Sequence, residues 1–198
     1  ACVAAKQLLL SITLLSVGIM AVALIFNTPI IKVVFGKIDA DVMQNARIYF
    51  YLSALSYPFL AIFNAGAALF RTMNNAKISM FTSILMNIIN ISGNALLIFV
   101  FQMGVTGAAL ASLASRVAGA VIMVLLLRNS SNRIYIDTFK KWRFDGKMIK
   151  SILRIGIPSG LENGIFQVGK ILVQGLIASF GTMAIAANAV ANNFAAIE

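Results

Sequence analysis

Residues 80–101, MFTSILMNIINISGNALLIFVF, decide the fold class of this chain. The stretch is long enough to cross a bilayer as a helix, since about 20 residues at a rise of about 1.5 Å cover roughly 30 Å of hydrocarbon. Four polar residues recur in it at spacings of four, three and four: Ser83, Asn87, Asn90 and Asn94. These spacings predict one polar helix face, which is costly in contact with lipid. We therefore expect neighbouring helices or a hydrated cavity to lie against it.

The rest of the composition predicts a membrane protein. Of the 198 residues, 60% are hydrophobic and 11% are charged, whereas soluble domains carry about 25% charged residues; the mean hydropathy is +0.92. Apolar windows lie at about 8–31, 48–70, 78–101, 104–127 and 155–178, and an incomplete one begins near 183. We expect an all-α integral membrane protein, a polytopic helical bundle. Because no initiator Met is present and both ends run into apolar windows, we also expect a part of a longer transporter.

Basic residues between the windows predict the orientation. One side carries Lys6, Arg71, Lys77, Arg128, Arg133, Lys140, Lys141, Arg143, Lys147, Lys150 and Arg154; the other carries Lys32, Lys37 and Arg47. The excess predicts that the first side is cytoplasmic. The net charge of +10 then reflects membrane orientation and attraction to anionic lipids, and we expect no nucleic-acid partner.

One long basic loop predicts the domain organisation. Other connections are short, whereas a polar stretch at 129–151 separates two groups of windows. We expect N-lobe helices at 1–128, a cytoplasmic inter-lobe loop at 129–151, and the start of a C-lobe at 152–198. Paired lobes with a substrate site between them are common in transporters.

The second window combines polar residues with a predicted kink. Ser53, Tyr57 and Asn64 share one helix face, and Pro58 removes a backbone hydrogen bond. Tyr57 and Asn64 are candidates for a substrate cavity. The alternative is that they only link helices by hydrogen bonds.

The fourth window combines close packing with a buried charge. Small residues at Gly104, Gly107, Ala108, Ala111, Ser115 and Gly119 favour close helix contact. Arg116 lies near the middle of the window, one turn after Ser112, and needs a partner or water there. It is either the counter-charge of an intramembrane carboxylate or a donor to backbone carbonyls, and both remain open.

The fifth window repeats the polar pattern of the third. Its stripe has the same spacings of four, three and four: Asn163, Gln167, Lys170 and Gln174. Glu162 lies beside this stripe and is the one carboxylate in a complete window; desolvation there would favour proton uptake near neutral pH. The alternative is a salt bridge from Glu162 to Lys170 or Arg116. We interpret the two stripes as walls of a central cavity, whose substrate-binding candidates are Tyr57, Asn64, Asn87, Arg116, Asn163, Gln167, Lys170 and Gln174.

Three segments together resemble a known family. They are GAALFRTMNNAKISM at 66–80 with the Asn series after it, GVTGAALASLASR at 104–116, and RIGIPSGLENGIFQVGKILVQGLIASFGTMAIAANAVANNF at 154–194. In this order, around a long basic loop, they resemble multidrug and toxic compound extrusion (MATE) transporters. The windows would correspond to the third through seventh helices and part of the eighth in a two-lobe fold of twelve helices.

The resemblance implies a function and a set of site residues. It implies export of amphipathic, often cationic organic compounds in exchange for Na⁺ or H⁺ by alternating access, with no other cofactor. Asn90, Asn94 and Ser112 match positions of an N-lobe cation site in the family, where an acidic residue is common at the position of Asn94. A family carboxylate on the seventh helix aligns with Phe166, and Glu162 lies about one turn earlier. The expected partners are membrane lipids, organic cations or drugs, and the remaining helices of the same protein, in the cell membrane.

Several other classes of protein are alternatives to an antiporter. A lipid-linked precursor flippase should have a more cationic cavity than Arg116 and Lys170 provide, and a channel or a non-transporting membrane subunit would not couple export to a gradient. An enzyme is not expected, because the chain has no His, and its predicted spans have no Asp or paired carboxylates for a catalytic or metal site.

Overall fold

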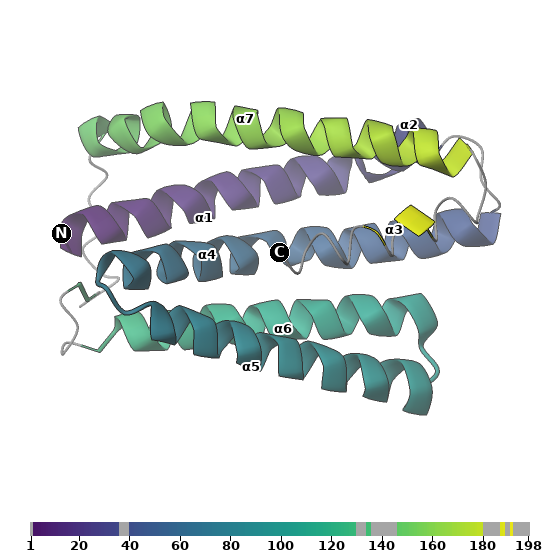
Figure 1. Cartoon of the computed structure of the whole chain (residues 1–198), viewed down its shortest axis with the longest axis horizontal. Coiled ribbons are helices and arrows are strands. Elements are labelled where there is room, and N and C mark those ends of the chain that lie inside the picture. Colours follow the sequence, from purple (N-terminus) through teal and green to yellow (C-terminus); the bar gives the residue numbers. More distant parts are fainter. Residues whose placement is uncertain are drawn as a thin grey trace. The chain divides into compact units, whose positions relative to one another are not determined.

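The computed structural model describes residues 2–35, 40–129, 134–135, 146–179, 187–188 and 191. The regular elements in these residues are helical: α1 (Cys2–Ile25), α2 (Asn27–Phe35), α3 (Ala40–Leu55), α4 (Tyr57–Thr72), α5 (Ala76–Asn94), the π-helical segment η1 (Ala95–Val100), α6 (Gly104–Leu127) and α7 (Gly146–Ser179). They belong to two compact units, unit 1 (Ala1–Asp145) and unit 2 (Gly146–Glu198), which are described separately. Figure 1 labels the helices. The boundary between the units lies inside the loop predicted at 129–151.

Several helices are long and apolar enough to span a membrane. In the described ranges these are Cys2–Ile25, Ala76–Val100 and Gly104–Leu127, and a fourth span results if the bent pair Met43–Leu55 and Tyr57–Thr72 is one. They confirm the first four predicted windows as helical. The fifth window lies in α7, but α7 is not among these spans, because its repeated amide and charged side chains lower its hydropathy.

The first predicted window is displaced in the structure. It was expected at 8–31, whereas α1 begins at Cys2 and ends at Ile25, and α2 starts anew at Asn27. Hydrophobicity continues across this point, so a window cannot locate the break. The sequence Asn27-Thr28-Pro29 explains it, since Pro29 has no N–H for the helical ladder.

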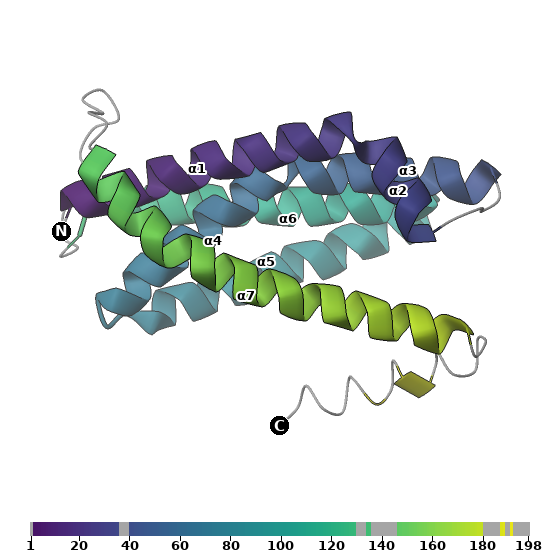
Figure 2. The same ribbon diagram turned by 90° about the horizontal axis from the view of Figure 1, so that it is seen from above.

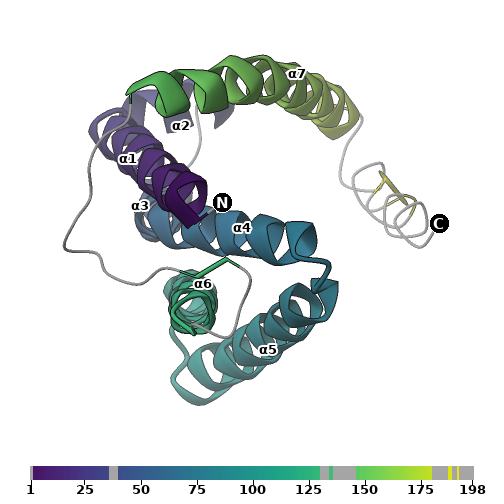
Figure 3. The same cartoon turned by 90° about the vertical axis from the view of Figure 1, so that its left-hand side faces the viewer.

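Unit 1 is built around α6. Seen end-on, α6 lies between α4 and α5, and α1 lies on the other side of α4 (Figure 3); Figure 2 shows α1 and α3–α4 running alongside one another. Contacts between α5 and α6, α1 and α4, and α4 and α6 hold the unit together. Its core contains Ala5, Leu9, Ala65, Ala67, Leu69, Phe70, Met123 and Leu127. Many outward side chains are apolar instead, such as Phe99 at 79% exposure and Ile25 at 73%, as suits a lipid-facing surface.

The small residues predicted to pack do so between α5 and α6. Gly107, Ala111, Ser115 and Gly119 are buried. A Cβ atom built on Gly107 would lie 3.0 Å from the Leu97 carbonyl oxygen, so the backbones meet there. Gly104 is exposed instead; its φ of +53° starts α6 after the turn from η1, a conformation that glycine adopts without strain.

Short turns place the helix ends of unit 1 on two sides. The turn from α4 to α5 is closed by the Asn75 N–H donating to the Phe70 carbonyl at 2.9 Å. The start of α1, the end of α4, the start of α5 and the end of α6 therefore lie at one end of unit 1 (Figure 1). Lys6, Arg71, Lys77 and Arg128 belong to these helix ends, which is the arrangement that the predicted orientation requires. The orientation itself stays a prediction.

Candidate functional site

The predicted kink at Pro58 is confirmed as a break between α3 and α4. The two helices meet at Ser56 with a bend of 41°, and Pro58 lies in the first turn of α4. Ser56 is fully buried, at 0% exposure. Its hydroxyl donates to the Ser53 carbonyl at 2.6 Å. A side-chain hydroxyl thus bonds to the last turn of α3 at the break.

Arg116 reaches this break from α6. Its Nη1 donates to the Ser56 hydroxyl, and this is its one polar contact within the part of the chain that the structure describes. Neither predicted partner, an intramembrane carboxylate or a backbone carbonyl, is in contact with Arg116 there. The Ser56 hydroxyl is the partner instead, because the helix break lies beside α6 and within reach of the Arg116 guanidinium.

A second polar group joins α5 to α6. Asn90 Nδ2 donates to Ser112 Oγ at 3.2 Å, and Asn94 Nδ2 donates to Asn90 Oδ1 at 3.0 Å. The structure therefore brings together the three residues predicted as an N-lobe cation site. We call Asn90, Asn94 and Ser112 the amide cluster.

The amide cluster holds one unused acceptor. Asn94 Oδ1 is buried and has no hydrogen-bond donor among the described residues. Asn94 is the last residue of α5, and the π-helical segment η1 follows directly. Such π-helical turns are frequent at functional sites. Their wider turn shifts the register of the residues that follow, which the spacing of the Asn series did not predict.

Other members of the predicted polar face do not join the amide cluster. Ser83 is half-buried, and Asn87 is exposed. From the second window, Tyr57 is half-buried, while Asn64 is exposed. No hydrogen bond links these four side chains to the cluster within the described ranges, so their assignment to a substrate cavity stays a prediction.

In unit 2, the second predicted stripe follows one continuous helix. All side chains from Arg154 to Gln174 are exposed, including Glu162, Gln167 and Gln174. Asn163 Nδ2 donates to the Ser159 carbonyl at 2.8 Å within α7. Lys170 Nζ lies 5.1 Å from the centre of the Phe166 ring. In the described part of α7, Lys170 is thus placed over an aromatic ring rather than against Glu162.

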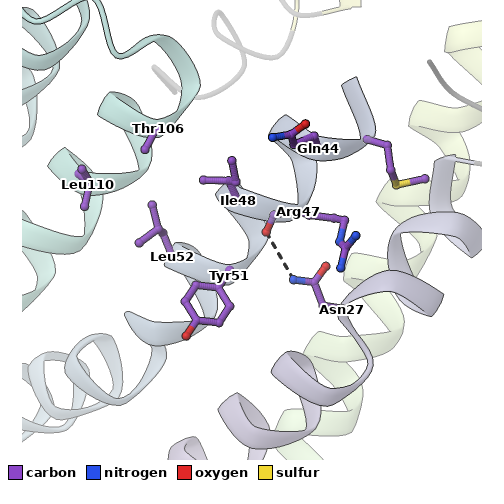
Figure 4. A pocket seen from close by; sticks show the side chains of 9 residues that line it. Asn27, Gln44, Arg47, Ile48, Tyr51, Leu52, Thr106 and Leu110 are labelled. Atoms are coloured by element: carbon purple, nitrogen blue, oxygen red, sulfur yellow. Dashed lines mark hydrogen bonds between the residues drawn. The ribbon is translucent and has the colours of Figure 1, made fainter. Parts of the chain in front are cut away.

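A pocket in unit 1 involves residues that were not predicted from the sequence. It has a volume of about 870 Å³ and lies between the start of α2, α3 and the start of α6 (Figure 4). Its lining is Asn27, Met43, Gln44, Arg47, Ile48, Tyr51, Leu52, Thr106 and Leu110. Asn27 Nδ2 donates to the Arg47 carbonyl at 3.4 Å, and Asn27 Oδ1 is buried without a donor among the described residues. The spacing of Gln44, Arg47 and Tyr51 on one face of α3 was the available signal.

Known sequences resemble this chain, some over its first half and others over most of its length. The sequence profile of the MatE family matches residues 1–96. A Bacillus subtilis (strain 168) protein described as the uncharacterized transporter YisQ is 28% identical over 176 residues, covering 86% of this chain and 38% of that protein. The multidrug export protein MepA of Staphylococcus aureus (strain bovine RF122 / ET3-1) is 26% identical over 168 residues, covering 85% of this chain and 37% of its own length. The chain thus resembles the MatE family over residues 1–96 and a multidrug export protein over most of its length.

Solved structures of MATE proteins share the fold. A crystal structure of a MATE protein in a bent conformation matches with a TM-score of 0.77 at 20% identity, covering 93% of this chain and 44% of that one. An inward-facing multidrug resistance MATE transporter matches with a TM-score of 0.71, covering 92% of this chain and 47% of that one. The helical arrangement is therefore that of MATE transporters. This chain spans less than half the length of these relatives.

Proposed function

We propose that the transporter containing this chain is an antiporter that exports amphipathic or cationic organic compounds in exchange for Na⁺ or H⁺ by alternating access. The amide cluster carries the proposal, since it places a buried, unused oxygen acceptor between two spans of a MATE fold. Relatives described as a multidrug export protein and a probable multidrug resistance protein support the substrate class. The proposal sets the protein in the cell membrane as a multi-pass protein, with its inter-lobe loop cytoplasmic.

The chemistry of the amide cluster limits what it does in this antiporter. Amide and hydroxyl oxygens are ligands for hard cations, but affinity rises with the charge of the ligands, and this cluster has none. It is therefore a weak Na⁺ site. Neither an amide nor a hydroxyl takes up a proton near neutral pH, so proton coupling requires another group.

Glu162 provides the missing charge in this proposal. It is the carboxylate of α7, and it lies beside a stripe of hydrogen-bonding side chains. A carboxylate binds either a proton or Na⁺, so one residue accommodates both coupling ions. We propose that Glu162 is neutralised during each transport cycle.

The substrate side of the proposal rests on the remaining polar residues. Amide and phenol groups accept and donate hydrogen bonds in many geometries, which suits compounds of varied structure. Arg116 and Lys170 carry positive charge and would disfavour cationic substrates close to them. The candidates remain Tyr57, Asn64, Asn87, Arg116, Asn163, Gln167, Lys170 and Gln174.

Transport by the full-length protein in proteoliposomes tests the proposal. Ethidium, a cationic amphipathic dye, is loaded under an imposed pH gradient or an imposed Na⁺ gradient, and its movement is compared between the wild type and Glu162→Gln. We expect gradient-driven transport in the wild type and its loss in Glu162→Gln, with Asp145→Asn as the control for loss of a carboxylate outside the predicted spans. Unchanged gradient-driven transport in Glu162→Gln would remove Glu162 from the mechanism. Wild-type transport that ignores both gradients would refute antiport.

A further inference from the structure

Arg116 and Ser56 make a contact that the proposed transport cycle does not use. Arg116 lies near the middle of α6, where a charged side chain is costly and needs compensation. Its one described polar partner is the hydroxyl of Ser56, at the junction of two other helices. The two residues are 60 positions apart, so this contact joins separate spans and not neighbouring turns.

The hydroxyl of Ser56 is oriented by the break itself. Pro58 has no N–H, so the helical ladder is interrupted there. Ser56 supplies two donors to the same acceptor: its hydroxyl reaches the Ser53 carbonyl at 2.6 Å, and its backbone N–H reaches it at 3.1 Å. Because the hydroxyl hydrogen is committed to Ser53, the oxygen lone pairs remain for Arg116. A chain of hydrogen bonds therefore runs from α6 through Ser56 to the end of α3.

Burial makes this chain hard to replace with water. Ser56 and Ala54, two residues before it, are both at 0% exposure. A buried hydroxyl that loses one partner is left partly unsatisfied, which costs about 1–3 kcal/mol. Linked hydrogen bonds in a low-dielectric interior also strengthen one another. The hydrogen bonding at the break thus includes a donor that comes from another helix.

We propose that Arg116 is a positioning residue that holds the break between α3 and α4 in its bent form. One turn earlier on α6, Ser112 accepts the hydrogen bond from Asn90 of α5. The same helix therefore bonds to the amide cluster and to the break, and a shift of α6 acts on both. This role does not depend on which ion drives transport or on whether Glu162 takes part.

Spin labels on the two sides of the break test the proposal in the full-length protein. Asn45 of α3 and Ala68 of α4 are exposed, so each is changed to Cys for labelling after Cys2 is changed to Ser. Measured from Ser56, the helix arms are about 17 and 18 Å long at about 1.5 Å per residue. Straightening the 41° bend would lengthen the distance between the labelled positions by about 2 Å. We expect a narrow distance distribution in the wild type, and a broader one shifted toward longer distances in Arg116→Met and Ser56→Ala.

Matched variants separate positioning from a general loss of stability. Arg71→Met is the control, because Arg71 Nε donates to the Ala67 carbonyl of its own helix at 3.3 Å; it should leave the distribution unchanged. Arg116→Lys keeps a donor and Ser56→Thr keeps the hydroxyl, so both should restore the narrow distribution.

The double variant gives the decisive comparison. If Arg116 acts through Ser56, then Arg116→Met adds no further broadening in a Ser56→Ala background. Additive broadening, or a wild-type distribution in Ser56→Ala, would overturn the proposal. Ser56→Ala removes a single oxygen atom, so it still decides the question if Arg116→Met does not fold.

Discussion

Replacing Asn94 with Asp tests whether the amide cluster has the geometry of a cation site. Asn94 Nδ2 donates to Asn90 Oδ1 at 3.0 Å in the wild type. In Asn94→Asp, a carboxylate oxygen faces the Asn90 oxygen, so two acceptors meet without a donor. Without a bound cation, this variant is then less stable than the wild type. A cation bound between the two oxygens would restore the stability.

The expected size follows from these contacts. Losing the hydrogen bond and leaving acceptors unpaired costs about 1–3 kcal/mol. A monovalent cation about 4 Å from the new carboxylate gains about 4 kcal/mol at an effective dielectric constant of about 20. When the cation is present at about 100 times its dissociation constant, linkage predicts stabilisation by about 2.7 kcal/mol. We therefore expect Na⁺ to recover most of the stability lost by Asn94→Asp.

Thermal unfolding of the full-length protein measures this effect. The melting temperature Tm is followed as NaCl replaces N-methylglucamine chloride at constant ionic strength, which separates Na⁺ binding from screening. Asn87→Asp is the matched control, since Asn87 lies on the same helix but is exposed. We expect a steep rise of Tm with Na⁺ in Asn94→Asp, a small one in the wild type, and no added response in Asn87→Asp. If Na⁺ raised the Tm of both Asp variants equally, the amide cluster would not have the geometry of a cation site.

Two further predictions concern packing and orientation. Gly107→Ala should lower the stability of the protein by about 1–3 kcal/mol, because its Cβ would lie 3.0 Å from the Leu97 carbonyl oxygen. Gly18→Ala is the control, because a Cβ atom there would have no neighbour within 4 Å; it should leave stability unchanged or raise it by about 0.5–1 kcal/mol. A melting temperature that falls in Gly18→Ala but not in Gly107→Ala would contradict the packing of η1 on α6. Cysteines replacing Lys37 and Lys141, with Cys2 changed to Ser, should react with a membrane-impermeant thiol reagent from the outer and the cytoplasmic side respectively. Labelling from one side only would contradict the predicted orientation.

Much of the fold could be predicted because lipid imposes a simple rule. A span must be apolar and about 20 residues long, so hydropathy located the helices from Cys2 to Leu127, and Pro58 located the break. Hydropathy does not locate helix ends inside an apolar stretch, which is why the interruption before Asn27 was missed. The fifth window lies in a continuous helix, but α7 carries more polar side chains than the helices that qualify as spans.

The candidate site was predictable only in part. Helical spacing placed Asn90 and Asn94 on one face, and family resemblance added Ser112, which the structure brings within hydrogen-bond reach. Spacing did not separate these residues from exposed Asn87, because periodicity describes a face and not its neighbours. The partner of Arg116 was missed for the same reason. Ser56 looks unremarkable in the sequence until the break turns its hydroxyl toward another helix.

The distribution of charge gives the two units different tasks in the proposed cycle. Within the helices of unit 1 from Tyr57 to Leu127, the sequence contains no carboxylate, and Arg116 is a fixed positive charge near their middle. Arg116 lies one turn after Ser112 of the amide cluster, so its charge disfavours a cation there. By bonding to Ser56, the guanidinium is drawn toward the break rather than toward the cluster. The amide cluster thus contributes neutral ligands at most, and the negative charge that a coupling cation needs must come from residues beyond these helices.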